Sequence, residues 1–304
     1  MIVRDKLTHL PERFPFSCQW EITCRCNLHC VMCYTDCFNR PDSIRQELAT
    51  ADILRIMDEL AEAGTLELCL TGGEPLARPD FFQLYEHAIQ CGFLVTVFTN
   101  GTLITEAHAD RFAALRPHCI ELSLHGITRE TFERVTLGQG SYNRCLLAIG
   151  LLLDRQIPLV LKSTAMTLNY QEILAIKQYV ASLGRVTYKL GEEMRPELDG
   201  NVAPFQYALT EQDLRELNRQ DLDLWRDACR RESVEPSLCR SGMQRFHIDA
   251  YGQLQLCSGN RAESYDLRTG SFRRGFFESL PAFVCEWKMP DESALIHPTV
   301  HHAD

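Results

Sequence analysis

The sequence predicts an α/β protein built on a parallel sheet, and three observations support this. Six short, apolar, β-rich segments alternate with six amphipathic helical patterns between about residues 18 and 190. Segments that are apolar over most of their length are typical of strands buried under helices. Successive strand–helix units imply a parallel sheet with right-handed crossovers. In such sheets, active sites lie at the carboxyl ends of the strands.

The boundaries of these units follow from the apolar periodicity and from the turn residues between them. The expected strands span residues 18–23, 66–72, 93–99, 119–124, 158–164 and 185–190. The expected helices span residues 50–63, 80–91, 104–115, 128–136, 142–155 and 170–183. Asn169 or Tyr170 would begin the last helix, and Gly184 would end it.

The chain changes character after residue 190. Residues 191–235 are more polar, with a loop followed by an amphipathic helical pattern within 210–231. From residue 236 a second pattern begins, with a hairpin expected in 246–257 and its turn at Tyr251-Gly252. We therefore expect a barrel-like part over 1–190, a connection over 191–235, and a small second domain with a loose tail over 236–304.

Composition narrows the class of protein. The chain has 304 residues, 45% of them hydrophobic, and a net charge of −10, which argues against a nucleic-acid partner. No apolar run is long enough for a membrane span, and the charged first ten residues do not fit a signal peptide. We expect a cytoplasmic protein, where clustered cysteines usually bind metal. Four isolated cysteines are expected to be small buried hydrophobes instead: Cys69, Cys91, Cys119 and Cys145.

A group of three cysteines follows the first expected strand, as Cys26-x3-Cys30-x2-Cys33. Thiolates are the usual ligands of iron–sulfur clusters. Three ligands rather than four would leave one iron open to substrate or cofactor. Zinc is the rival interpretation, but a zinc ribbon needs a second cysteine pair close by, and the spacing here is not the usual one.

The stretch from Cys26 to Cys33 resembles the CxxxCxxC signature of the radical S-adenosylmethionine (radical SAM) superfamily. The resemblance implies a partial, TIM-like (β/α)6 barrel that holds a 4Fe–4S cluster and S-adenosylmethionine. In that family, reductive cleavage of the sulfonium yields a 5′-deoxyadenosyl radical that abstracts hydrogen from an unactivated C–H bond. A flavodoxin- or ferredoxin-type protein would donate the electron. Met32 stands where the family often has an aromatic residue, and it would pack on adenine.

The second expected strand runs into Thr71-Gly72-Gly73-Glu74-Pro75. This segment is similar to the family's clamp for the amine of the methionine moiety. The two glycines would allow the backbone to approach a ligand closely. Thr71, Gly72, Gly73 and Glu74 are therefore expected to bind the cofactor, with the Glu74 carboxylate beside an ammonium. An ordinary strand–helix turn is the alternative.

Further motifs end the next strands. Asn100 lies in a TNG turn and Ser123 in a segment similar to the family's SLDG, where it would contact the cofactor carboxylate or ribose. His125 stands where the family often has Asp, and it would either contact substrate or serve as a plain turn residue. Arg134 and Lys162 are the basic residues expected to bind the methionine carboxylate, unless they are solvated surface charges.

A second group of cysteines lies downstream, with Cys239 and Cys257 separated by 17 residues and Cys285 beyond them. The pattern around Cys239 and Cys257 resembles the SPASM and twitch extensions of radical SAM proteins. Only Cys285 follows, so the resemblance implies one auxiliary 4Fe–4S cluster in a twitch-like domain. The fourth ligand of this cluster would be Cys229, or that iron would stay open to substrate or water. Cys229 could instead be a buried thiol of a helix.

The favoured reaction is maturation of a ribosomal precursor peptide by epimerisation or cross-linking, as in the peptide maturases that this sequence resembles. Cys24, Cys37 and Cys229 are the thiols expected to return a hydrogen atom. Only 25 residues precede Cys26, so no leader-binding domain is expected there.

Two other functions stay open. A small-molecule dehydrogenase would oxidise an alcohol of a sugar or aminocyclitol, with Glu192, Glu193 and Asp199 gripping amino groups. An iron–sulfur or zinc protein without enzymatic activity would explain the cysteines, but neither the GGEP segment nor the barrel pattern.

Overall fold

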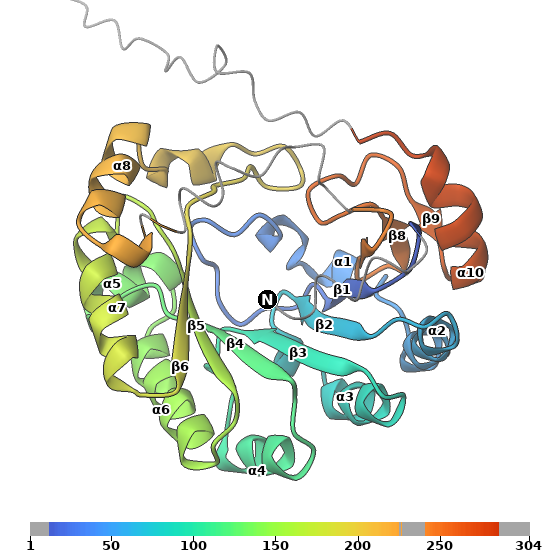
Figure 1. The fold of residues 1–304 in the computed structure, drawn as a ribbon, viewed down its shortest axis with the longest axis horizontal. Helices are drawn as coiled ribbons and strands as arrows, with labels where there is room; N and C mark the ends of the chain where they lie inside the picture. The colour runs from blue at the N-terminus through green and yellow to red at the C-terminus, as the bar shows by residue number, and fades with distance from the viewer. Residues whose placement is uncertain (1–11, 225, 227–240, 286–304) are drawn as a thin grey trace, which may run out of the picture.

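The computed structural model describes residues 12–224, 226 and 241–285, and one curved sheet organises them (Figure 1). The strands lie in the order β6-β5-β4-β3-β2-β1-β7-β8-β9. The first six, all parallel, confirm the expected strands to within one residue at each end: β1 (Ser17–Thr23), β2 (Glu67–Gly72), β3 (Leu94–Thr99), β4 (Cys119–Ser123), β5 (Leu159–Thr164) and β6 (Val186–Gly191).

Helices cover the convex side of this sheet (Figure 1). They are α2 (Thr50–Glu62), α3 (Phe81–Gln90), α4 (Glu106–Ala114), α5 (Arg129–Thr136), α6 (Ser141–Asp154) and α7 (Ile173–Ser182). The last expected helix begins with a 3-10 turn over Tyr170–Glu172, and Gly184 ends the unit at a φ of +83°. Asn169 makes no capping bond and instead donates to the carbonyl of His125.

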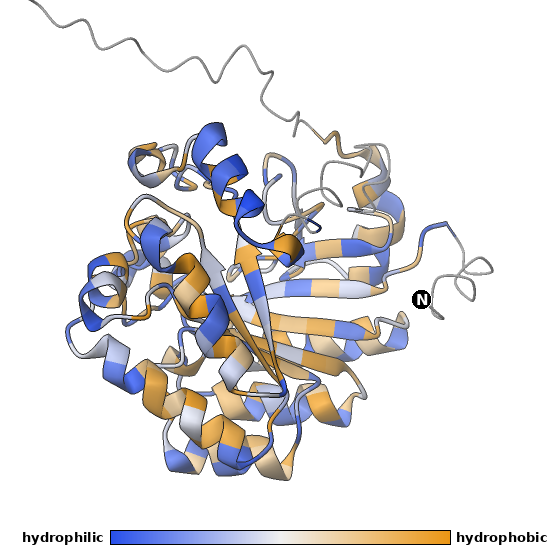
Figure 2. Ribbon diagram, turned by 60° about the vertical axis from the view of Figure 1, so that its left-hand side comes forward, coloured by the Kyte–Doolittle hydropathy of each residue, from blue (hydrophilic) through white to orange (hydrophobic). Residues whose placement is uncertain are grey.

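The two faces of the sheet differ in chemistry. Leu68 and Leu70 of β2 and Leu122 of β4 are fully buried in the core under the helices. The alternate residues of the same strands point to the concave side, where β4 and β5 carry Glu121 and Lys162. The central strands are accordingly largely orange in Figure 2. In barrels of parallel strands, ligands bind at the carboxyl ends of the strands.

The hairpin expected after residue 245 is confirmed, and it joins the same sheet. β7 (Arg245–Ile248) pairs in parallel with β1, while β8 (Gln253–Gln255) and β9 (Tyr265–Asp266) continue antiparallel. Gly252 in the turn has a φ of +83°. Without β7, β1 would present an unpaired edge. The C-terminal strands therefore lie directly beside the strand that leads into the cysteines.

The connection between β6 and β7 is described in part. α8 (Glu211–Arg219) begins with a capping box in which Thr210 and Asp213 exchange hydrogen bonds. It confirms the start of the amphipathic helix expected within 210–231. The described part of the chain also has two short α-helices, α1 (Pro41–Ile44) and α10 (Phe272–Arg274).

Candidate active site

The loop that follows β1 carries the three cysteines and lies on the concave side of the sheet (Figure 1). The backbone N–H of Val31 donates to the carbonyl of Val135 at 2.9 Å, and that of His29 donates to Thr136 at 3.3 Å. Leu28, at 2% exposure, anchors the loop in the protein. The end of α5 thus fixes the loop where the parallel strands finish.

The thiols of Cys26, Cys30 and Cys33 lie close enough together for the charge of one to affect the pKa of another. Burial raises the pKa of Cys26 to about 12, and the charge of Cys33 adds to the effect. Burial also raises the pKa of Cys30 well above its usual range, with further contributions from Cys33 and Cys26. A bound cation would reverse these shifts, because thiolates need positive charge nearby.

The spacing of the thiols favours a cluster over a single ion. Among the described residues, two sets of three ligating atoms lie within 4.8 Å of one another, and neither contains Cys26, Cys30 or Cys33. Around one zinc ion, bonds of about 2.3 Å would bring the sulfur atoms closer together than that. At least two of the three sulfur atoms therefore lie more than 4.8 Å apart. Three thiols fit a 4Fe–4S cluster with one open iron.

Two clamps hold the cysteine loop. Asn39 accepts from the N–H of Cys26 at 3.1 Å and donates to its carbonyl at 3.0 Å. Asn100, at the end of β3, places its amide 3.9 Å from the Cys26 sulfur and 3.1 Å from the Asn27 side chain. The TNG turn therefore contacts the cysteine loop directly. Met32 in the same loop is half-buried.

The two glycines at the end of β2, Gly72 and Gly73, allow close contact with the chain that leads into the cysteine loop. A Cβ on Gly72 would lie 2.1 Å from the carbonyl oxygen of Thr23, and one on Gly73 would lie 2.3 Å from that of Arg25. Backbone N–H groups of Gly73 and Glu74 donate to those same two carbonyls. The close approach that the glycines permit is thus to the chain leading into Cys26, a partner that the sequence did not predict.

Glu74 is fully buried, and its carboxylate is occupied within the protein. It accepts from the Thr99 hydroxyl and the Asn100 N–H, each at 2.7 Å, and from the Leu76 N–H at 3.2 Å. Burial raises the pKa of Glu74 to about 7 against these hydrogen bonds. The structure gives this carboxylate a different partner from the ammonium expected of it: it ties the GGEP turn to the TNG turn. Thr71, three residues before Glu74, is buried in β2.

The expected cofactor contacts on β4, α5 and β5 fall into two groups. Ser123 is half-buried at the end of β4 in register with Lys162 of β5. Lys162 lies 3.0 Å from the Glu121 carboxylate and 3.8 Å from the centre of the Phe98 ring. Arg134 is exposed near the end of α5, so the structure offers Lys162 rather than Arg134 to a ligand on the concave side.

His125 is structural in this arrangement. It is 6% exposed, and its Nδ1 accepts from the N–H of Thr164 at 3.3 Å. Burial, with a smaller contribution from Lys162, lowers its pKa to about 4. The ring is therefore neutral at physiological pH, and this burial argues against the substrate contact considered from the sequence.

A cavity of about 250 Å³ lies beside the cysteine loop, between the end of β1 and the C-terminal hairpin. The Cys24 thiol lines it and donates to the Glu47 carboxylate at 3.2 Å. The other lining residues are Glu21, Thr23, Thr35, Phe38, Gly72, Gly73, Leu198, Asp249, Ala250, Tyr251, Gln255 and Arg261.

A buried ion pair forms one wall of this cavity, and sequence reasoning missed it. Arg261 donates two hydrogen bonds to Glu21, at 2.9 and 2.6 Å, and the Tyr34 hydroxyl donates to the same carboxylate at 3.2 Å. Burial alone would raise the pKa of Glu21, but His247 and Arg261 hold it well below its usual range. One carboxylate thus joins the residue after Cys33 to the loop after Cys257.

Glu47 forms a second buried contact that the sequence did not single out. Its carboxylate accepts from the Thr23 hydroxyl at 2.6 Å and from the Cys24 N–H at 2.8 Å. Arg25 and Arg78 lie 3.3 and 3.8 Å from its other oxygen. Glu47 therefore fixes the two residues that lead into the cysteine loop. No local pattern marks Glu47 or Arg261, because their partners lie far away in the sequence.

The loop after β6 packs on the cysteine loop near Cys37. The N–H of Leu198 donates to the carbonyl of Tyr34 at 2.9 Å. The thiol of Cys37 is buried, and its sulfur lies within 4.8 Å of ligating atoms of Glu197 and Asp199. Cys229, the third thiol expected to donate hydrogen, lies outside the described residues.

The expected auxiliary cluster is described in part. Asn260 donates its N–H to the Cys257 sulfur at 3.3 Å and its side-chain amide to the carbonyl of Val284 at 3.2 Å. This brings Cys257 near Val284, the residue before Cys285, whose side chain is exposed. Cys239 lies outside the described residues. Cys257 and Cys285 thus share one corner of the fold.

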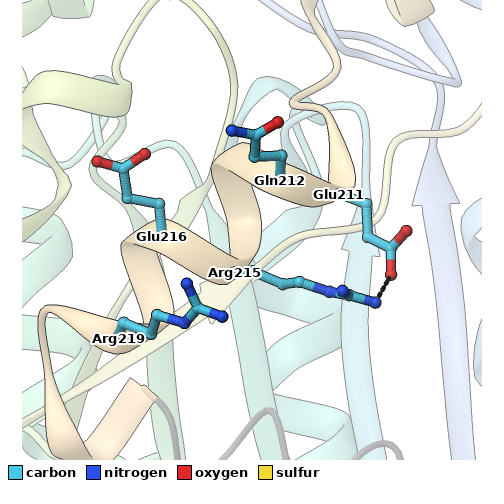
Figure 3. A pocket seen from close by; sticks show the side chains of 5 residues that line it. All are labelled: Glu211, Gln212, Arg215, Glu216 and Arg219. Carbon is cyan, nitrogen blue, oxygen red and sulfur yellow. Dashed lines mark hydrogen bonds and ion pairs between the residues drawn. The ribbon is translucent and has the colours of Figure 1, made fainter.

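A second hollow, of about 620 Å³, has none of the cysteine-loop residues in its lining. Its lining comes entirely from one face of α8: Glu211, Gln212, Arg215, Glu216 and Arg219 (Figure 3). Arg215 pairs with Glu211 one turn away, and both are more than 60% exposed. A charged face of one helix is typical of a solvated surface.

The family model of the radical SAM superfamily matches residues 20–180, which contain the cysteine loop, the end of β1 and the whole of β2, β3, β4 and β5. This chain belongs to the radical SAM superfamily. As a radical SAM enzyme, it uses S-adenosylmethionine and a 4Fe–4S cluster. No helix in the described part of the chain combines the length and apolar character that a membrane span needs.

Relatives within the superfamily differ in what they make. An AdoMet-dependent heme synthase from Methanosarcina barkeri is 32% identical over 169 residues, covering 56% of this chain and 48% of the relative. A PqqA peptide cyclase from Rhizobium meliloti is 32% identical over 162 residues, covering 52% and 42%. This radical SAM chain therefore spans about half the length of the curated relatives it matches.

The fold likeness extends further along the chain than the sequence likeness. The crystal structure of Streptococcus suis SuiB bound to its precursor peptide SuiA superposes with a TM-score of 0.73 at 16% identity. It covers 93% of this chain and 69% of SuiB. The likeness shows that the C-terminal strands, as well as the barrel, share the fold of that protein.

Proposed function

We propose that this enzyme matures a ribosomally made precursor peptide by abstracting a hydrogen atom from one of its residues. The observation that carries the proposal is the cavity beside the cysteine loop, which Cys24 helps to line. The cluster and S-adenosylmethionine, when bound, would supply the abstraction of hydrogen from an unactivated C–H bond. Cys26, Cys30 and Cys33 would hold that cluster.

The other residues of the site would bind and orient the cofactor. Ser123 and Lys162 lie in register at the carboxyl ends of β4 and β5 and would contact the methionine carboxylate. The backbone of Gly72 and Gly73 would present carbonyls to its amine, with Glu74 and Asn100 fixing the turns. Met32, half-buried in the cysteine loop, would pack on the adenine.

Cys24 is the favoured hydrogen donor among the thiols proposed from the sequence. It lines the cavity, and its hydrogen bond to Glu47 orients it. Cys37 does not line that cavity, because the loop after β6 packs over it. A donor thiol on the opposite side of a substrate carbon from the abstracting group would return hydrogen with inverted configuration. This favours epimerisation over cross-linking. The thiyl radical left on the cysteine would then take one electron from the reducing protein and one proton from solvent.

An auxiliary 4Fe–4S cluster would be held by Cys257 and Cys285 together with Cys239. Asn260 links the first two of these positions by hydrogen bonds to the Cys257 sulfur and the Val284 carbonyl. A flavodoxin- or ferredoxin-type protein would reduce the enzyme. The relatives named peptide cyclases support a peptide substrate, as does the fold shared with peptide-bound SuiB.

The small-molecule dehydrogenase is less well supported. Its proposed acidic contacts are engaged inside the loop after β6, where Glu193 pairs with Arg195 at 3.1 Å and Asp199 accepts from the Asn201 N–H at 3.0 Å. These carboxylates would have to leave their partners before gripping an amino group. The peptide therefore remains the proposed substrate class.

The test is hydrogen return from solvent. The reconstituted enzyme is incubated in D₂O with S-adenosylmethionine, a reductant and the peptide encoded beside its gene. Because a thiol exchanges its hydrogen with solvent, one deuterium per modified residue is expected, together with a D-residue. Cys24→Ala should abolish deuterium incorporation while the S-adenosylmethionine is still cleaved. Cys119→Ala, a half-buried thiol of β4, is the control. No modification of any peptide, with oxidation of a sugar or aminocyclitol instead, would contradict the proposal.

A further inference from the structure

Three metal-ligating side chains converge on the outer surface of the barrel, away from the cysteine loop. Asp58 lies on α2, while His87 lies on α3 and Cys91 directly follows it. The Nε2 atom of His87 lies 2.7 Å from the Asp58 Oδ1, and the Cys91 sulfur lies 3.6 Å from the same oxygen. All three ligating atoms lie within 4.8 Å of one another.

The helices fix this arrangement. His87 and Cys91 are four residues apart, and the N–H of Cys91 donates to the carbonyl of His87 at 2.9 Å in the last turn of α3. Side chains at this spacing project from the same helix face. Asp58 comes from the middle of α2 and faces them from the neighbouring helix. A nitrogen, a sulfur and an oxygen ligand thus point at one position without any loop rearrangement.

An ordinary ion pair explains this cluster poorly. The side chains of His87 and Asp58 are 27% and 56% exposed. Exposed ion pairs contribute little to stability. The His87–Asp58 pair therefore gives no energetic reason for the Cys91 thiol to bond to the same Asp58 oxygen. Imidazole, thiolate and carboxylate are together the ligands that zinc uses in proteins. Calcium and magnesium prefer all-oxygen sites, which this one is not.

The distances also suit a tetrahedral ion. Zinc bonds of about 2.0–2.3 Å place neighbouring ligand atoms roughly 3.3–3.8 Å apart. The sulfur–oxygen distance of 3.6 Å already has this value. The 2.7 Å contact between His87 and Asp58 would have to lengthen, and the His87 nitrogen and Cys91 sulfur, which lie within 4.8 Å of each other, would have to settle at the tetrahedral spacing. The side chains of His87 and Asp58 are exposed enough to turn.

We propose that Asp58, His87 and Cys91 form a surface site for a zinc-like divalent transition metal, with water as the fourth ligand. Binding would release the Cys91 proton to solvent, because a metal-bound cysteine is a thiolate. The imidazole binds in its neutral form, and two anionic ligands balance the ion's two positive charges. In the apo site, burial and the Asp58 carboxylate raise the pKa of the Cys91 thiol, and the cation would remove that penalty.

The second set of ligating atoms, Cys37 with Glu197 and Asp199, does not support a similar proposal. Cys37 is buried where the loop after β6 packs on it, and the Leu198 N–H of that loop donates to the carbonyl of Tyr34. Loop packing therefore accounts for that convergence. The surface triad has no such explanation among the described residues.

The proposal is tested on the cluster-loaded enzyme, prepared anaerobically, so that the cluster cysteines are occupied. Zinc affinity is measured by calorimetry, and cobalt is the spectroscopic probe because a cobalt–thiolate bond gives a charge-transfer band. We expect one equivalent of tightly bound metal per chain and a thiolate band. Cys91→Ser should abolish the band and, like His87→Gln, weaken zinc binding at least tenfold.

The controls are His118→Gln, which removes an exposed imidazole, and Cys119→Ser, which removes the half-buried thiol that follows it in the sequence. Neither residue is part of the triad. Both should bind zinc as the unaltered enzyme does. Equal affinity in Cys91→Ser and Cys119→Ser, or a cobalt spectrum without a thiolate band, would overturn the proposal. The iron content of each variant is measured in parallel, so that zinc entering an emptied cluster site is recognised.

Discussion

At the scale of single residues, the cysteine loop depends on backbone contacts so close that a side chain in place of a glycine hydrogen would not fit. Gly73 lies so close to the chain entering the cysteine loop that a Cβ would meet the Arg25 carbonyl oxygen at 2.3 Å. Gly150 in the middle of α6 has nothing within 4 Å of the same position. Substitution by alanine should therefore have opposite effects on stability at Gly73 and at Gly150.

Gly73→Ala should displace the cysteine loop, lowering both the iron content and the melting temperature of the enzyme. Gly150→Ala should stabilise the protein by about 0.5–1 kcal/mol, because alanine replaces glycine inside a helix. Iron analysis and thermal unfolding of both variants check this. An unchanged iron content in Gly73→Ala would show that the loop tolerates displacement.

His125 predicts a pH effect on stability. Burial lowers its pKa to about 4, whereas an exposed histidine titrates near 6.5. The unfolded chain therefore binds a proton at a pH where the folded protein does not, and stability falls as the pH drops below 6.5.

Between pH 7 and pH 5.5 this loss should amount to about 1 kcal/mol. Urea unfolding of the unaltered enzyme and of His125→Gln at both pH values isolates it, because the other titrating groups are common to both. An identical pH dependence of the two proteins would mean that His125 is protonated in the fold.

At the scale of elements, the decisive feature is how the C-terminal strands attach to the barrel. The six barrel strands could be predicted from the sequence because apolar runs and turn residues are local signals. The pairing of β7 with β1 could not, because Arg245–Ile248 is short and its partner precedes it by more than 200 residues. For the same reason Glu47 and Arg261 have no local signature, although they hold the cysteine loop.

The Glu21–Arg261 pair should be a strong link between these elements. Its side chains are 8% and 14% exposed, so removing one partner leaves a buried charge unpaired. Arg261→Gln should therefore lower the free energy of unfolding by about 3–5 kcal/mol.

Arg268→Gln is the matched control. Arg268 pairs with Asp266 at 2.9 Å, but the two side chains are 48% and 33% exposed. Its loss should cost less than about 1 kcal/mol, as for other surface pairs. Equal losses in the two variants on chemical denaturation would contradict a tight link between β1 and the C-terminal segment.

At the scale of the whole molecule, the motifs predicted from the sequence lie together in the structure, but several of their side chains have other partners than expected. The three cysteines were found from their spacing, and the GGEP and TNG turns from their resemblance to radical SAM motifs. The fold brings all three together at the carboxyl ends of β1, β2 and β3. The roles of the side chains were less predictable. Glu74 is turned inward to Thr99 and Asn100, and His125 is buried, because tertiary contacts decide which way a turn residue points.

Cleavage of S-adenosylmethionine tests the central claim most directly. The anaerobically reconstituted enzyme, supplied with dithionite and S-adenosylmethionine, is assayed for 5′-deoxyadenosine beside Cys30→Ala and the control Cys119→Ala. We predict 5′-deoxyadenosine from the unaltered enzyme and from Cys119→Ala, and none from Cys30→Ala. Equal amounts from Cys30→Ala, or none from the unaltered enzyme with its iron in place, would contradict a cluster held by the loop after β1.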